Sequence, residues 1–175
     1  MNRWLALVNR FSYWAGLAGF CLVLLATALV YQYILDYDPC VICIHVRIWV
    51  MALLLVAIVG MLLHRSRLAV LVMHFLSLLV SGVLLERAWK LLGIERGTVI
   101  GDCNFDLGMP AFLPLDSWFP WLFEVKESCG YTPPLPIGLS MAEMMVILSV
   151  ALVVITLVMT VFSALVIGRG THSAR

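Results

Sequence analysis

The chain has 175 residues, of which 63% are apolar, and its mean hydropathy of +1.06 is far above that of a soluble domain. Its net charge is +1 and no basic surface with interleaved aromatic residues is visible, so nucleic acid is excluded as a partner. These properties predict an all-α membrane protein with a single integral membrane domain over residues 1–175, in contact with the lipid bilayer.

Long apolar stretches predict a bundle of four transmembrane helices. At about 1.5 Å per residue, a span of about 30 Å needs about 20 residues. The first stretch is too long for a signal peptide and no small-residue cleavage site follows it, so we expect it to remain as a helix. The second stretch is too short unless its helix begins near residue 41 and includes Arg47. The expected spans are residues 11–35, 41–63, 68–86 and 143–168, with loops over about 36–40 and 87–142 on one side.

Charge is distributed unequally between the two ends of this bundle. The end that holds both termini and the turn between the second and third spans carries arginines and no acid. The other end carries all ten acidic residues. The positive-inside rule therefore predicts that both termini are cytoplasmic and that the loops at 36–40 and 87–142 face outward, which in a bacterial inner membrane is the periplasm.

Two pairs of cysteines fall on the outward side, where disulfides can form. Cys40 and Cys43 form a Cys-x-x-Cys pair at the expected start of the second helix, where backbone N–H groups and the helix dipole stabilise a thiolate. Cys103 and Cys129 lie in the long loop and could form a structural or an exchangeable disulfide. Pairing within each loop is the simplest of the three possible connectivities, but the sequence does not choose between them. Cys21 lies inside the first span and is expected to be a small apolar residue.

Metal and haem sites fit these cysteines poorly. Covalent haem attachment needs a histidine directly after the second cysteine, where Ile44 stands. A zinc site of four cysteines would need two close pairs, and Cys103 and Cys129 are far apart in the sequence. No metal site is predicted.

Arg47 follows Cys43 by four residues, so the two side chains share a helix face. A cation there can stabilise a thiolate and bind an anionic oxygen, whereas an isolated arginine at this depth would more often extend to the lipid headgroups. An oxidant at this depth would be reached from the lipid, and no nucleotide-binding glycine loop is present, so a membrane quinone fits best. His45 could relay protons but is more often a polar anchor, and His74 is expected to be hydrogen-bonded inside the bundle.

The long outer loop contains the segment FLPLDSWFPWLFEVKES. If residues 117–127 are helical, one side of the helix is apolar and the other acidic. Such a helix would lie on the membrane surface or pack against the bundle, and both interpretations remain open. The apolar side would contain Trp118, Trp121, Leu122 and Val125.

The order and spacing of these features resemble the DsbB family of quinone-coupled disulfide-forming membrane proteins. The resemblance covers nearly the whole chain: four spans, PCVIC followed by IHVR, Cys103, LPLDSWFPWLF and Cys129. It implies a four-helix bundle in the bacterial inner membrane, with a long periplasmic loop bearing a short interfacial helix. Ile42 and Val46 stand where the family often has Leu and a polar or acidic residue, which bears on the tuning of the site and not on its chemistry. Some members have a quinone-linked histidine near the end of the third helix, where this chain reads ERAWK, so no second quinone ligand is assigned.

The resemblance also implies a thiol:quinone oxidoreductase. A reduced periplasmic DsbA-like thiol oxidase would attack the Cys103–Cys129 disulfide, with Cys103 forming the mixed disulfide. Cys40, the more exposed of its pair, would exchange with the loop pair. Cys43 would then pass two electrons to ubiquinone or menaquinone, and Arg47 would hold the reacting complex.

Two other classes share some of these features. A four-span adaptor with a disulfide-stapled loop explains the topology but not a Cys-x-x-Cys pair beside Arg47. A quinone-linked reductase of the vitamin K epoxide reductase type normally has its Cys-x-x-Cys pair after the loop cysteines, whereas here the pair comes first.

Overall fold

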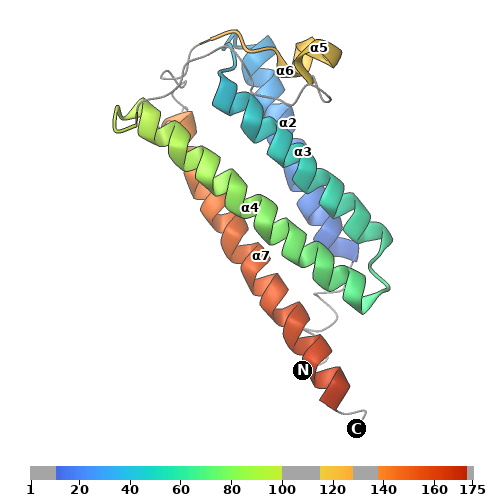
Figure 1. Ribbon diagram of the computed structural model, residues 1–175. Helices are drawn as coiled ribbons and strands as arrows, with labels where there is room; N and C mark the ends of the chain where they lie inside the picture. Colours follow the sequence, from blue (N-terminus) through green and yellow to red (C-terminus); the bar gives the residue numbers. More distant parts are fainter. Residues whose placement is uncertain (1–10, 100–114, 128–137, 173–175) are drawn as a thin grey trace.

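The computed structural model describes residues 11–99, 115–127 and 138–172. The elements in these ranges are helices: α2 (Phe11–Tyr33), α3 (Val41–Leu62), α4 (Arg67–Glu95), α5 (Leu115–Trp118), α6 (Pro120–Phe123) and α7 (Met141–His172). Four of them, α2, α3, α4 and residues 141–165 of α7, are long and apolar enough to cross a membrane. The short α5 and α6 lie over one end of the bundle (Figure 1). The all-α four-helix membrane fold is therefore confirmed.

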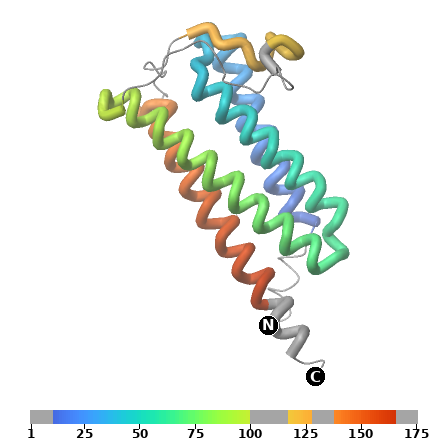
Figure 2. Tube along the Cα trace, in the orientation of Figure 1, coloured from blue at the N-terminus to red at the C-terminus, as the bar shows by residue number. Residues whose placement is uncertain are grey.

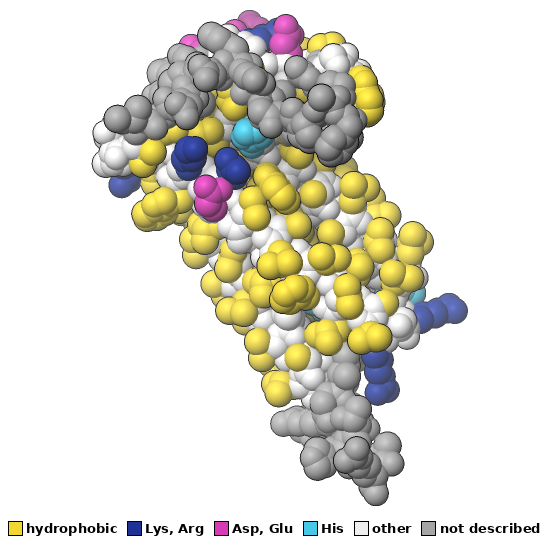
Figure 3. Space-filling view, in the orientation of Figure 1, with side chains coloured by type: hydrophobic (Ala, Val, Ile, Leu, Met, Phe, Trp, Pro, Cys, Tyr) yellow, Lys and Arg dark blue, Asp and Glu magenta, His cyan; other side chains and the backbone are white. Residues whose placement is uncertain are grey.

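The long helices pack in the order α2, α3, α4 and α7, each against the next (Figure 2). Figure 3 shows an apolar surface along the length of the bundle, with charged side chains gathered towards its two ends. This arrangement suits a bilayer, in which backbone polar groups must be satisfied within each helix and apolar side chains face lipid.

α4 continues to Glu95, beyond residue 86 where we expected the third span to end. The charged residues between residues 86 and 95 do not end the helix, because charged side chains near the end of a transmembrane helix can extend to the headgroup region. Gly97, two residues after the end of the helix, has a positive φ of 68°. The N–H groups of Gly97 and Thr98 donate to the carbonyls of Ile94 and Gly93. These bonds satisfy the last carbonyls of the helix, as a left-handed residue after a C-terminus commonly does.

The outer ends of α4 and α7 are joined by a polar network. The Ser140 hydroxyl accepts from the N–H of Glu143 at 3.2 Å, and the Glu143 carboxylate accepts from the N–H of Ser140 at 3.1 Å. This reciprocal cap defines the start of α7. Arg96 Nη2 donates to Glu143 at 2.8 Å, and the Ser140 hydroxyl donates to Glu95 at 3.0 Å. The network fixes the first turn of α7 to the last turn of α4.

At the other end of the bundle, a buried aromatic contact joins three helices. The Trp14 ring on α2 stacks on the His74 ring of α4, with centroids 4.7 Å apart, and both residues are fully buried. Trp14 also lies directly over Gly60 of α3, where an added Cβ would come within 2.5 Å of the indole. Close packing of α2 on α3 therefore requires a glycine at this position.

Gly60→Ala is expected to lower the stability of the protein by about 1–3 kcal/mol, because the added methyl group cannot enter the space that the Trp14 ring fills. Unfolding of the detergent-solubilised protein, followed by near-UV circular dichroism, measures this change. Gly82→Ala is the matched control, since an added Cβ there meets no atom within 4 Å. Equal stability of the two variants would show that Trp14 can move without cost.

Candidate functional site

The cysteine pair lies where the sequence places it, at the start of α3. Cys40 is the N-cap residue, with extended backbone angles, and its sulfur accepts from the N–H of Cys43 at 3.3 Å. The two Sγ atoms are 2.6 Å apart. An S–S bond is about 2.05 Å long, so only a small side-chain movement separates the dithiol and disulfide arrangements. The helix N-terminus stabilises negative charge on either sulfur.

Cys40 is covered by a segment of the outer loop. The N–H of Lys126 donates to the Pro39 carbonyl at 3.2 Å, and Glu127 pairs with Cys40 in a parallel β-bridge. Phe123, which is fully buried, packs in the same apolar cluster as Cys40. The expectation that Cys40 is the more exposed cysteine of its pair is therefore wrong: Cys40 is 4% exposed, and Cys43 is half-buried.

The segment that covers Cys40, residues 115–127, does not form one helix over residues 117–127. Pro120 begins a separate turn of helix, α6, because it cannot donate a backbone hydrogen bond and disfavours helical angles at Phe119. Glu124 has extended angles, and the chain then runs alongside Cys40. The expected apolar side is divided accordingly. Leu122 and Val125 pack against the cluster around Cys40, whereas Trp118 and Trp121 are 57% and 55% exposed.

Arg47 is buried inside the bundle, with 7% of its surface exposed, so it does not extend to the headgroups. Its guanidinium donates to the Gln32 side-chain oxygen at 2.5 Å, to the Ala28 carbonyl at 3.3 Å and to the Leu122 carbonyl at 3.2 Å. Within the described ranges, its partners are thus a carboxamide and two backbone carbonyls, and no carboxylate pairs with it. The positive charge remains available for an anionic sulfur or oxygen.

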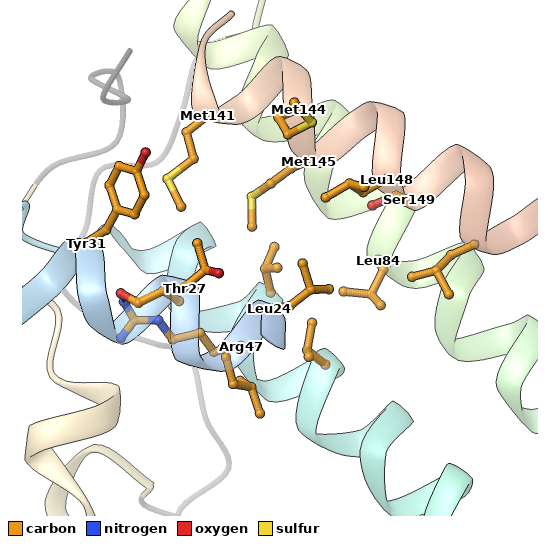
Figure 4. A pocket seen from close by; sticks show the side chains of 15 residues that line it. Leu24, Thr27, Tyr31, Arg47, Leu84, Met141, Met144, Met145, Leu148 and Ser149 are labelled. Carbon is orange, nitrogen blue, oxygen red and sulfur yellow. Dashed lines mark hydrogen bonds between the residues drawn. The ribbon is translucent and has the colours of Figure 1, made fainter. Parts of the chain in front are cut away.

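Two cavities meet at Arg47. The inner cavity, of about 110 Å³, lies between α2, α3, α4 and α7 and has an almost entirely apolar lining. Figure 4 shows Met141 and Met145 of α7 pointing across it towards α2, opposite Arg47. The outer cavity, of about 60 Å³, is lined by Cys40 and Cys43 together with Asp38 and two tyrosines. Arg47, Met141 and Met145 line both cavities, so the sulfurs and the apolar space share one site.

Three of the predicted site residues, Cys40, Cys43 and Arg47, are thus brought together. Cys103 and Cys129 lie outside the described residues. His45 is half-buried on α3 and does not appear among the described residues that line the two cavities. His74 lies in the aromatic contact with Trp14.

Sequence reasoning missed two residues that shape the site. Gln32 is the polar group on α2 that holds Arg47, and its signal was a single amide near the end of an otherwise apolar span. Asp38 lines the outer cavity, and its signal was its position two residues before Cys40.

Comparison with known proteins agrees with this arrangement. The family model described as "Disulfide bond formation protein DsbB" matches residues 9–159. "Disulfide bond formation protein B 2" of Pseudomonas aeruginosa is 33% identical over 146 residues, covering 81% of this chain and 85% of that protein. "Disulfide bond formation protein B" of Shewanella sp. is 33% identical over 136 residues, covering 77% of each, and that of Shewanella denitrificans is 30% identical over 150 residues, covering 82% of each. The chain belongs to the DsbB family.

Proposed function

We propose that this chain is a disulfide-generating thiol:quinone oxidoreductase of the bacterial inner membrane, which reoxidises a periplasmic DsbA-like dithiol oxidase. Electrons pass from the partner to Cys103 and Cys129, then to Cys40 and Cys43, and finally to a membrane quinone. One observation carries the proposal: a close pair of sulfurs lines an outer cavity that adjoins an apolar inner cavity at Arg47, a buried arginine that pairs with no carboxylate among the described residues. Membership of the DsbB family supports it.

The covering segment supports transfer between the two cysteine pairs. The β-bridge holds Glu127 beside Cys40, and Cys129 follows Glu127 by two residues in the sequence. The outer loop thus approaches Cys40 from the side on which Cys40 is closed to water. Exchange within one chain needs no surface access to Cys40, whereas attack by an external thiol does. We therefore assign entry of electrons to Cys103 and Cys129, and relay to Cys40.

The size and lining of the two cavities support binding of a quinone ring. A cavity of about 150 Å³ lined by apolar side chains can hold a benzene ring, and the two adjoining cavities together reach a comparable volume. Arg47 is placed to donate to a quinone oxygen, and the apolar walls suit the ring and the start of its tail. When bound, a quinone accepts two electrons and two protons. Either ubiquinone or menaquinone meets these requirements.

The quinone would enter sideways from the lipid. α2 and α7 both line the inner cavity. In the described ranges, α2 packs mainly on α3 and α7 packs mainly on α4, so α2 and α7 make few contacts with each other beside the cavity. An apolar ligand dissolved in the bilayer could reach Arg47 through this side without crossing the headgroup region.

The charge distribution supports an orientation with both termini in the cytoplasm. Arg65 lies in the turn between α3 and α4 and Arg67 begins α4, whereas the opposite end carries the acidic residues and the cysteine pair. Short arginine-bearing loops stay on the cytoplasmic side. The site would then open to the periplasm, where disulfides are made. A disulfide-stapled adaptor without redox turnover explains neither the site nor the family membership.

Anaerobic mixing of three components tests the proposal: the purified, detergent-solubilised protein, a reduced DsbA-like partner and one quinone, with quinone absorbance as the readout. We expect quinone reduction that requires the partner and all four loop cysteines. The test is repeated with ubiquinone and with menaquinone. No reduction of either, by protein whose disulfides are shown to be intact, would favour the adaptor.

A further inference from the structure

Turnover at this site must move protons as well as electrons, if the proposed function holds. Each cycle breaks the S–H bonds of Cys40 and Cys43, forms one S–S bond, and forms two O–H bonds on the quinone. Cys40 is 4% exposed and the cavities beside it are mostly apolar. Water therefore has little access to Cys40 and to the apolar inner cavity, whereas Cys43 is half-buried, and a side chain that carries protons from the sulfurs towards the inner cavity is needed at the site.

Asp38 has the required position. It lines the outer cavity together with Cys40, Cys43 and Arg47, and it is also exposed to solvent. Pro39 favours an extended backbone at Asp38, and Cys40 itself is extended. In an extended segment, side chains two residues apart point to the same side. An extended backbone at Asp38 would thus place its carboxylate on the same side as the Cys40 sulfur, in keeping with the outer cavity that both residues line.

The other ionisable groups that line the two cavities are poorly suited to this task. Among the described lining residues they are two cysteines, Arg47, Tyr31 and Tyr37, and Asp38 is the one carboxylate. An arginine is a permanent donor without an acceptor, whereas carboxylates are common general acids and bases in catalysis. We propose that Asp38 is a catalytic residue that carries protons from the thiols to the quinone oxygens.

The step balances with one carboxylate. As the Cys40 and Cys43 sulfurs bond to each other, two electrons leave them for the quinone. Asp38 accepts the proton of one thiol and delivers it to a quinone oxygen, and then does the same for the proton of the second thiol. The carboxylate is unprotonated again at the end of the cycle. Arg47 holds the negative charge that develops before each proton arrives.

Asp38→Asn tests this role because the amide keeps the shape of the side chain and cannot carry a proton. The reaction is isolated in a Cys103→Ser, Cys129→Ser background, in which the Cys40–Cys43 dithiol is prepared chemically and then mixed with quinone in a stopped-flow instrument. We expect the rate at saturating quinone to fall about 100-fold, with little change in the quinone concentration that gives half the maximal rate. Added acetate, a small carboxylate, should restore part of the rate, and Asp38→Glu should restore more.

Asp36→Asn is the matched control. It removes the same charge from the same loop, and Asp36 is absent from the described lining of both cavities. Its positive φ of 54° is one that asparagine adopts readily, so the backbone should be unaffected. We expect this variant to react like the parent.

Three results would overturn the assignment: an Asp38→Asn rate within twofold of the parent, an equal loss in Asp36→Asn, or a loss confined to quinone affinity that acetate does not restore. The last result would identify an electrostatic role. Absence of quinone reduction in the parent background would instead contradict the proposed function, so the two failures are distinguishable.

Discussion

Cys43→Ser is expected to abolish quinone reduction, with a residual rate below about 10⁻³ of the parent. Cys40 and Cys43 both line the outer cavity with Arg47, and we propose that Cys43, which precedes Arg47 by one turn of α3, passes electrons onward. A serine hydroxyl remains protonated at neutral pH and neither forms a disulfide nor accepts electrons. The measurement is anaerobic quinone absorbance with a reduced DsbA-like partner. Cys40→Ser should give the same loss, because it removes the other half of the disulfide.

Cys21→Ala is the control for this prediction. Cys21 is fully buried within α2 and belongs to the apolar core beside Trp14 and Leu17. We expect full quinone reduction and a modest loss of stability from the smaller side chain. If Cys43→Ser retained full turnover while the control behaved as expected, the electron route through Cys43 would be wrong.

The bundle and the place of the cysteine pair could be predicted from the sequence because they depend on local properties. Apolar length predicts spans, and the shortness of the second apolar stretch required a helix that begins near Val41 to Ile44 and includes Arg47, as α3 does. The spacing of four residues then placed Arg47 below Cys43 on one helix face. Pro120 was also a local signal. A proline inside a helix removes a backbone hydrogen bond, so Pro120 predicts a break there and argues against a single helix over residues 117–127.

The contacts that complete the site depend on tertiary packing, for which the sequence has no local signal. Gln32 on α2 and the Leu122 carbonyl of α6 both reach Arg47, although they are far from it in the sequence. Phe123 and the bridge at Glu127 bury Cys40, which the family resemblance implied to be the more exposed cysteine of its pair. Burial of Cys40 supports the proposed exchange with the loop pair of the same chain, which needs no surface access to this sulfur.

Arg47→Ala is expected to lower kcat/KM for quinone about 10³-fold. A rate loss of this size is typical when a donor that stabilises developing negative charge is removed. The substitution removes the one cation that lines the two cavities in the described ranges, and it leaves Gln32 and two carbonyls without their donor. Exchange between the two cysteine pairs should survive. α6 stays attached because the Tyr33 hydroxyl still donates to the Trp121 carbonyl and Phe123 stays buried.

Two further variants separate charge from geometry at this position. Arg47→Lys keeps a positive charge but lacks the planar fork that reaches three acceptors at once, so its loss should be intermediate. Arg87→Gln removes a partly exposed arginine on α4 that pairs with Glu86 and does not line either cavity, and its activity should match the parent. An unchanged KM and kcat for quinone in Arg47→Ala would remove the arginine from the site. Loss of thiol exchange together with quinone reduction would assign it instead to holding α6 over Cys40.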